Sequence, residues 1–363
     1  MAPLLERLDS LIAQAEEVYE REYLKARRAS VLARHGQFAD ARFALAGLRS
    51  QSQRLRHPVL LAWIALVVGL IEHCEALSSG AREKFRRAHA MALAAGDAPL
   101  TAESAAWLSV ADLNANDIEA TVAHAAEALR LAPPDAHGAR ARASLVVGDA
   151  WRFAGEDASA QPWYQRVRQH AAAEGDVSLV SILLYNMAAF RAYRIALDDA
   201  FGRADLAEAQ RVLMEAESTG NYDAGVGNAQ LAAQVPILRA QLLVVTGHYA
   251  EAVSLIDAQL AAARDEGLSH REARFLADAA HAEVQLGRDE DALKRVRLVQ
   301  AALVLVTDDD DVAGTHARLA GVLRALGQDD AADMHVREAK AAFVRHQAAQ
   351  LRWADALRQA GLS

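Results

Sequence analysis

The stretch Gly247-His248-Tyr249-Ala250-Glu251-Ala252 decides the fold, because it joins two alanine-rich runs with helical periodicity, Val235–Thr246 and Val253–Ala263. A glycine ends a helix at little cost, since it enters the left-handed backbone region without a Cβ clash. The small side chain of Ala252 lets the second helix approach the first closely. The stretch therefore predicts a tight turn between two packed helices.

The same turn recurs along the chain at a fixed spacing. Gly247, Gly287 and Gly327 are 40 residues apart, and a period of this size is typical of stacked helical hairpins. The turn residues that we identify are Gly36, Asn116 (a weaker copy), Gly155, Gly247, Gly287 and Gly327. We expect an all-α fold, a right-handed α-solenoid of about eight helix-turn-helix repeats with no β-sheet.

The repeats divide the chain into three parts. We expect a single domain over residues 1–363, with an N-terminal helix within residues 1–21 (its amphipathic part over 3–20), repeats over residues 22–345 and a capping helix over residues 346–363. Repeats two and five depart from the motif, at Ser78–Gly80 and at Ala196–Arg203. Because Asp329–Ala360 contains neither glycine nor proline, the chain should end in one long helix or two abutting ones.

Composition narrows the class of protein. The hydrophobic fraction is 53% and the net charge −9, without the dense basic stripe that nucleic-acid binding requires. The apolar run Pro58–Ile71 is too short to span a bilayer and predicts a buried helix. Cys74 is the only cysteine, so no disulfide framework exists, and no secretory signal begins the sequence. We expect a cytoplasmic protein that binds neither nucleic acid nor membrane.

Small residues surround each turn and give the repeats a family resemblance. Seven residues before the turn residue stand Ala29, Ser109, Gly148, Ala240, Ala280 and Ala320; five residues after it stand Ala41, Thr121, Ala160, Ala252, Ala292 and Ala332. In this pattern the chain resembles the tetratricopeptide repeat (TPR). The spacing near 40 residues looks like the longer variety, which occurs in sensor domains of bacterial transcriptional regulators and in peptide-pheromone receptors.

The resemblance implies a binding surface on the concave face, which is formed by the first helix of each repeat. In that family the exposed positions lie 13, 10, 6, 3 and 2 residues before the turn residue. They imply a partner-binding set of Asn114, Arg142, Asp149, Arg152, Tyr193, Gln234, Gln241, Arg274, His281 and Gln285, with Glu103 and Arg324 in equivalent positions. Amides can pair with a peptide backbone and arginines with carboxylates. The alternative is that these are solvated residues that pair among themselves, for example Asp149 with Arg152.

The chain shows no phosphate-binding loop, nucleophile elbow or metal-ligand cluster, so we expect no enzyme activity, no cofactor and no metal. The acids of Asp308–Asp311 are expected to cap the helix that follows them. We favour a non-enzymatic module that binds a peptide or protein segment. Two alternatives remain open: a regulator or sensor that binds a signalling peptide or small ligand, and a scaffold that forms a homodimer through the apolar side of the 329–360 helix.

The departures from the repeat pattern in repeats five and six generate a prediction about local stability. Asp198–Arg203 and Asn221–Gly227 should be among the least protected segments in amide hydrogen exchange, because the first lacks the turn motif and the second is rich in glycine. Protection equal to that of the motif-bearing turns at both segments would contradict this expectation.

Overall fold

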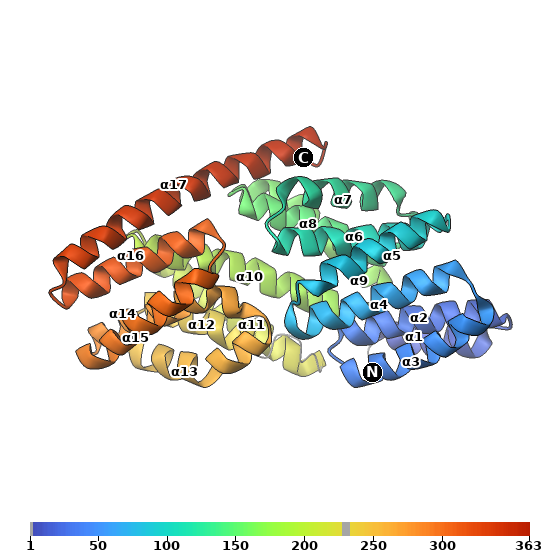
Figure 1. The fold of residues 1–363 in the computed structure, drawn as a ribbon, viewed down its shortest axis with the longest axis horizontal. Helices are drawn as coiled ribbons and strands as arrows, with labels where there is room; N and C mark the ends of the chain where they lie inside the picture. The colour runs from blue at the N-terminus through green and yellow to red at the C-terminus, as the bar shows by residue number, and fades with distance from the viewer. Residues whose placement is uncertain (1–2, 227–232) are drawn as a thin grey trace. The chain divides into compact units, whose positions relative to one another are not determined.

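A computed structural model describes residues 3–226 and 233–363, and every regular element within these two ranges is helical, with no strand (Figure 1). The all-α prediction is therefore confirmed for the described chain. Its α-helices are α1 (Pro3–Gln14), α2 (Val18–Arg34), α3 (Phe38–Leu55), α4 (Pro58–Ala76), α5 (Gly80–Ala94), α6 (Ala98–Asn114), α7 (Ile118–Leu131), α8 (His137–Phe153), α9 (Asp157–Glu174), α10 (Val177–Ala200), α11 (Leu206–Val226), α12 (Gln234–Val245), α13 (Tyr249–Asp265), α14 (Glu272–Gln285), α15 (Asp289–Ala302), α16 (Asp309–Ala325) and α17 (Asp329–Gln359). Two 3-10 helices, η1 (Leu268–Arg271) and η2 (Leu303–Leu305), complete the set.

One turn geometry closes the hairpins that carry the motif. At the stretch that opened the sequence analysis, Gly247 has a φ of 80°, and its N–H donates to the Val244 carbonyl at 3.2 Å. The next N–H, from His248, donates to the Leu243 carbonyl at 2.8 Å. These two bonds satisfy carbonyls that the end of α12 would otherwise leave free. The weaker copy is built in the same way, since Asn116 has a φ of 54° and the Asp117 N–H donates to the Asp112 carbonyl at 3.0 Å.

The small residues around the turns are the packing surfaces of the hairpins. All six residues seven places before a turn residue are buried, and all six alanine or threonine residues five places after it have no exposed surface. A Cβ on Gly148 would lie 2.6 Å from the Tyr164 ring, which shows how closely α8 approaches α9. The prediction that these positions allow close helix packing is confirmed.

Helices that follow one another in sequence pack against one another. Each hairpin pairs a first with a second helix, as α2 with α3, α4 with α5, α6 with α7 and α8 with α9. The first helices also contact one another in series, α2 with α4, α4 with α6 and α6 with α8, while α3, α5 and α7 each pack on the next first helix. In the C-terminal half, α12 contacts α13 and α14, and α14 contacts α15 and α16.

The contacts group the described residues into two compact units. We call residues 3–183, 225–226 and 350–363 the first unit, and residues 184–224 and 233–349 the second unit. Nothing in this grouping tests the expectation of one repeat domain, which stays a prediction. In the first unit, the Trp353 ring stacks on Phe153 with centroids 6.0 Å apart, and the Trp151 indole N–H donates to the Leu362 carbonyl at 2.9 Å.

Several boundaries differ from the sequence-based ones. The helix expected over residues 3–20 ends at Gln14, and the chain turns before α2. At this turn the Arg21 guanidinium donates a hydrogen bond to the Ala15 carbonyl at 2.6 Å, so that carbonyl is satisfied outside the helix. Helix α11 runs through Gly220 and ends at Val226. The C-terminal segment is one helix of 31 residues, one of the two forms expected. Pro236 lies in the first turn of α12, where a missing N–H costs little.

The departure expected in repeat five is confined to the length of its loop. The Gly202 N–H donates to the Asp199 carbonyl at 2.9 Å and the Arg203 N–H to the Asp198 carbonyl at 2.8 Å, as at the motif-bearing turns. However, α11 begins four residues after Gly202, whereas α13 begins two residues after Gly247. Of the second segment, Asn221–Gly227, residues 221–226 are helical and Gly227 lies outside the described residues.

The apolar helix α4 is longer than the run from which it was predicted. It has 19 residues, is long and apolar enough to cross a membrane by length and composition, and is 56% buried over its most apolar window. It packs against α2, α3, α5 and α6, and Trp63, Leu66 and Leu70 lie in the core. Burial of this kind is typical of the core helix of a folded domain.

The approach of α8 to α9 yields a test of the packing. Gly148→Ala should destabilise the protein by about 1–3 kcal/mol, because the new methyl group overlaps the Tyr164 ring. The matched control is Gly47→Ala in α3, where an added Cβ has no neighbour within 4 Å; it should stabilise by up to ~1 kcal/mol. Urea unfolding measures both, and equal effects would contradict the close-packing argument.

Candidate functional site

The first unit contains a cavity of about 250 Å³ whose walls are the first helices of the N-terminal hairpins. Tyr23, Arg27 and Arg34 line it from α2, Trp63 from α4 and Glu103 from α6. Leu4 and Leu8 of α1, residues 135–139 before and within α8, and Glu174 at the end of α9 complete the lining, with Pro99 and Pro133. The cavity therefore combines aromatic rings, aliphatic side chains and charges of both signs.

The α2 side of the cavity is one face of that helix. Tyr19, Tyr23, Arg27, Ser30 and Arg34 recur at intervals of three and four residues, which places them in a row. A shallower hollow, lined by Tyr19, Glu20, Tyr23 and residues 96–99, shares Tyr23 and Pro99 with the cavity. The row thus continues the cavity outward along α2.

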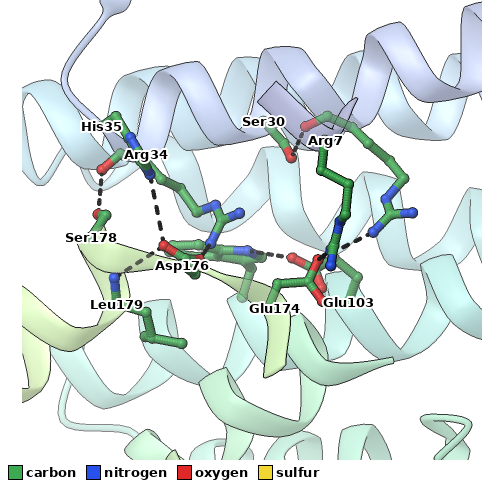
Figure 2. A network of polar contacts seen from close by, with 11 residues as sticks. Arg7, Ser30, Arg34, His35, Glu103, Glu174, Asp176, Ser178 and Leu179 are labelled. Carbon is green, nitrogen blue, oxygen red and sulfur yellow. Dashed lines mark hydrogen bonds and ion pairs between the residues drawn. The ribbon is translucent and has the colours of Figure 1, made fainter. Parts of the chain in front are cut away.

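Glu174 and Asp176, at the junction of α9 and α10, form ion pairs with the α2 arginines that line the cavity, Arg27 and Arg34 (Figure 2). Glu174 forms ion pairs with Arg7 and Arg27, each at 3.3 Å, and so ties α1 and α2 to α9. Asp176 pairs with Arg34 and accepts the Leu179 N–H at 3.1 Å, which caps α10. Burial alone would raise the pKa of the Asp176 carboxyl, but the Arg34 guanidinium holds it well below its usual range. Asp176 is therefore ionised and structural.

Arg142, on α8, is a buried arginine near Arg34 and Asp176. Its guanidinium stacks on the Trp107 ring at 4.1 Å, and the Trp107 indole N–H donates to Glu103 at 3.1 Å. Burial and the neighbouring Arg34 lower the pKa of Arg142 to about 10. Among the described residues, Arg142 Nη2 and Arg34 Nε have no hydrogen-bond partner although both atoms are buried. Each of these two guanidinium groups thus keeps one buried donor that no described residue accepts.

The expected binding residues of the first unit are mostly used internally. Arg142 and Asp149 are only 4% exposed, and Asp149 accepts the Tyr164 hydroxyl at 2.9 Å. Arg152 forms an ion pair with Asp157 at 2.6 Å, across the turn of repeat four. Asn114 is exposed at the end of α6. The expectation that Arg142 and Asp149 face solvent is wrong, because the first helices pack against one another as well as against their own partners.

In the second unit, too, expected binding residues are buried and form hydrogen bonds within the protein. Gln241 is buried and donates to Asp278 at 3.3 Å, and Arg274 is buried and donates to the Ala196 carbonyl at 2.6 Å. Tyr193 is half-buried and lies 3.9 Å beneath the Arg271 guanidinium. Gln241 and Arg274 are therefore also wrong as exposed positions.

Three expected binding residues of the second unit, His281, Gln234 and Gln285, are at least partly exposed to solvent. His281 is half-buried, packs edge-on against Tyr249 at 6.0 Å, and burial and Arg318 lower its pKa to about 4. Gln234 is half-buried and Gln285 is exposed. Binding by any of the ten residues stays a prediction.

Buried charges also organise the second unit. Asp278 on α14 accepts from Arg318 at 2.8 Å and lies 3.5 Å from Arg274, and Arg318 also pairs with Asp199 on α10. Asp311 pairs with Arg271 at 3.1 Å. Burial raises the pKa of Asp311 to about 7, although Arg271 opposes the shift. The pairs of Arg318 with Asp278 and Asp199, and of Arg271 with Asp311, connect elements that lie far apart in sequence.

The acidic stretch Asp308–Asp311, at the start of α16, caps the helix only in part as expected. Asp309, Asp310 and Asp311 lie in the first turn of the helix, where they complement its dipole. Asp308 is the N-cap residue but makes no side-chain capping hydrogen bond. The carboxylates of Asp308, Asp310 and Asp311 lie within 4.8 Å of one another, with the Arg271 guanidinium against them. The arginine supplies the positive charge that such a cluster needs.

Counting back from the turn residue, as for the other repeats, would have identified part of the cavity lining from the sequence. Counting 13, 6 and 2 residues back from Gly36 gives Tyr23, Ser30 and Arg34, all of which line it, and Glu103 was in an expected position. Trp63 and Glu174 could not be found in this way. Glu174 lies at the C-terminal end of a second helix, and only tertiary packing brings it to α1 and α2.

Comparison with known proteins gives no further assignment. No protein-family model matches the chain, and no curated protein is significantly similar to it.

His73, which packs between Phe85 and Trp107 with ring centroids 6.0 and 5.8 Å away, generates a pH prediction. Burial and the nearby Arg142 lower its pKa to about 4, whereas an unfolded histidine titrates near ~6.5. The unfolded state therefore binds the proton more tightly. The stability that the neutral ring contributes is complete above pH ~6.5 and is lost as the pH falls toward about 4, by about 3 kcal/mol.

His73→Leu should remove that share of the pH dependence. Urea unfolding at pH 7.5, 5.5 and 4.5 would show a flatter profile than the wild type, whereas Trp63→Phe, a core change without a titrating group, should lower stability equally at each pH. Parallel profiles for His73→Leu and the wild type would contradict the prediction.

Proposed function

We propose that the protein is a non-enzymatic peptide- or protein-binding module with a TPR-like fold, a right-handed solenoid whose concave first-helix surface receives an extended segment of its partner. The observation that carries the proposal is the cavity lined by α2, α4, α6 and α8, because a peptide can only be bound along a solenoid by residues from successive repeats. The contacts of first helices in series support the solenoid.

The chemistry of the cavity suits a peptide. Tyr23 and Trp63 offer apolar surface, and Arg27 and Glu103 offer a donor and an acceptor that are not fully buried. A peptide backbone alternates carbonyl and N–H groups and so uses both. The binding surface of this proposal is centred on repeats one to four.

The sensor alternative is favoured by the size and position of the cavity. At about 250 Å³ it can hold a small ligand, and α1 forms one of its walls through Leu4 and Leu8. A ligand bound there would therefore change how α1 packs. The self-association alternative requires the apolar side of the 329–360 helix as a dimer interface. Part of that side is already covered, because Trp353 and Leu357 at the end of α17 are buried within the first unit.

The proposed setting is the cytoplasm. Cys74 is the only cysteine and is half-buried, so the fold needs no oxidising compartment. The proposed partner is a protein or peptide, with no nucleic acid and no membrane, since the chain carries a net charge of −9.

The binding proposal is tested with peptides selected against the full chain from a random display library and then measured by fluorescence anisotropy. Arg27→Ala and Glu103→Ala should each weaken a selected peptide at least ~10-fold, because a buried polar contact of the bound peptide is left unpaired. The matched control is Arg87→Ala, an exposed arginine on the second helix α5. Wild-type affinity in both cavity variants, or loss in Arg87→Ala alone, would overturn the proposal.

A further inference from the structure

The shallow hollow next to the cavity of the first unit combines aromatic rings with carboxylates. Tyr19, Glu20 and Tyr23 line it from α2, and residues 96–99, which include Asp97 at the start of α6, line it from the other side. No basic side chain is among these lining residues. Because Tyr23 also lines the cavity, a peptide bound in the cavity can place a neighbouring side chain in the hollow.

We infer that this hollow binds a positively charged side chain, a lysine or an arginine, of the peptide whose adjoining residues occupy the cavity. The inference rests on the proposed peptide-binding function and names the class of peptide that the site accepts. It is carried by the aromatic rings of the hollow, by its two carboxylates and by a lining that holds no cation of its own.

The aromatic rings form a row from the hollow into the cavity. The ring centroids of Tyr19 and Tyr23 are 6.2 Å apart, and Tyr23 meets Trp63 of the cavity edge to face at 5.6 Å. His57 packs on Tyr19 with centroids 4.0 Å apart and so holds that ring in place. Both tyrosines are half-buried, so each keeps some accessible surface. An ammonium or guanidinium group within about 6 Å of such a ring is attracted to its face.

The two carboxylates keep a charge that no described cation pairs with. Asp97 accepts the Leu100 N–H at 2.9 Å, which fixes the carboxylate at the N-terminus of α6, and neither Asp97 nor Glu20 forms an ion pair within the described chain. Burial and the charge of Asp97 raise the pKa of Tyr23 to about 12, and the same two causes raise that of Tyr19. The tyrosines are therefore neutral near pH 7, and the charge of the hollow is that of its carboxylates.

The arginines of α2 on this side of the helix are engaged away from the hollow. Arg27, whose charge acts on Tyr23, pairs with Glu174 at 3.3 Å. Arg21 donates to the Ala15 carbonyl at 2.6 Å. Neither arginine lines the hollow. A cation that enters it therefore meets uncompensated negative charge, and the net charge of −9 favours its approach.

A lysine or arginine side chain suits both parts of the lining. Its apolar stem can lie along the tyrosine rings while its charged end contacts the carboxylates. A neutral side chain would remove water from Asp97 without supplying a partner, and an acidic one would add repulsion. The hollow thus selects among peptides by charge, whereas the cavity offers apolar surface and backbone partners.

The experiment takes peptides selected against the full chain from a random display library and measures them by fluorescence anisotropy. The peptides that bind should share a lysine or arginine, and glutamine in its place should weaken binding to the wild type at least ~10-fold. Against the double variant Glu20→Gln, Asp97→Asn, the same replacement should weaken binding less than ~3-fold, because the charges that recognise the cation are gone. Asparagine also caps helices, so α6 keeps its start, which circular dichroism checks.

Two further variants separate charge and ring contributions from general effects. Asp40→Asn removes an exposed carboxylate in the first turn of α3 that does not line the hollow, so the glutamine replacement should still cost at least ~10-fold there. Tyr19→Leu should weaken the cationic peptide more than Tyr19→Phe does, since phenylalanine keeps the ring face.

The outcomes distinguish this inference from the proposed function. Selected peptides that bind without a lysine or arginine, or an equal loss on glutamine replacement in the wild type and the double variant, would overturn the inference and leave the proposed function standing. A library that yields no binding peptide would overturn both. N-acetyl-arginine amide that binds as tightly as the whole peptide would overturn the peptide as occupant and assign the hollow to a small cation.

Discussion

The close approach of paired helices is the constraint on which the rest of the structure depends. Each motif-bearing turn ends its first helix in the same way, with a left-handed residue and two hydrogen bonds back into the last turn. This geometry directs the second helix back along the first, and the pair can then meet only where both helices carry small residues. Ala29, Ala41, Gly148 and Ala160 are such residues, and all are buried. Alanine-rich composition is thus a requirement of the architecture.

Tight alanine packing leaves little apolar volume, and long charged side chains fill the space between hairpins. Arg34 with Asp176 in the first unit, and Arg318 with Asp278 in the second, are buried pairs between helices of different repeats. Such pairs add little net stability when complete, but removing one partner strands a buried charge at a cost of about 3–5 kcal/mol. The polar residues of the first helices therefore serve the stacking of repeats, and only some remain free for a ligand.

The cavity lies between α1 and the first helices of the N-terminal hairpins. Helix α1 forms one of its walls through Leu4 and Leu8, which are themselves buried. Charge pairs at the edge of α1, such as Arg7 with Glu174, hold it there. The cavity and its mixed charges thus lie where α1 meets α2, α6 and the end of α9.

The sequence alone determined the helical class, the turn positions and the buried small residues, because each depends on local backbone preference and side-chain size at a fixed spacing. It also indicated Glu103, and by the same count Tyr23 and Arg34, as residues of the first-helix face. It could not determine which of those residues face solvent. Tertiary structure decided that Arg142 stacks on Trp107 and that Arg274 reaches the Ala196 carbonyl, since the exposure of a first-helix residue depends on neighbouring repeats. It also decided the meeting of Glu174 with Arg7 and of His316 with His335, because contacts between helices depend on packing angles that no local pattern encodes.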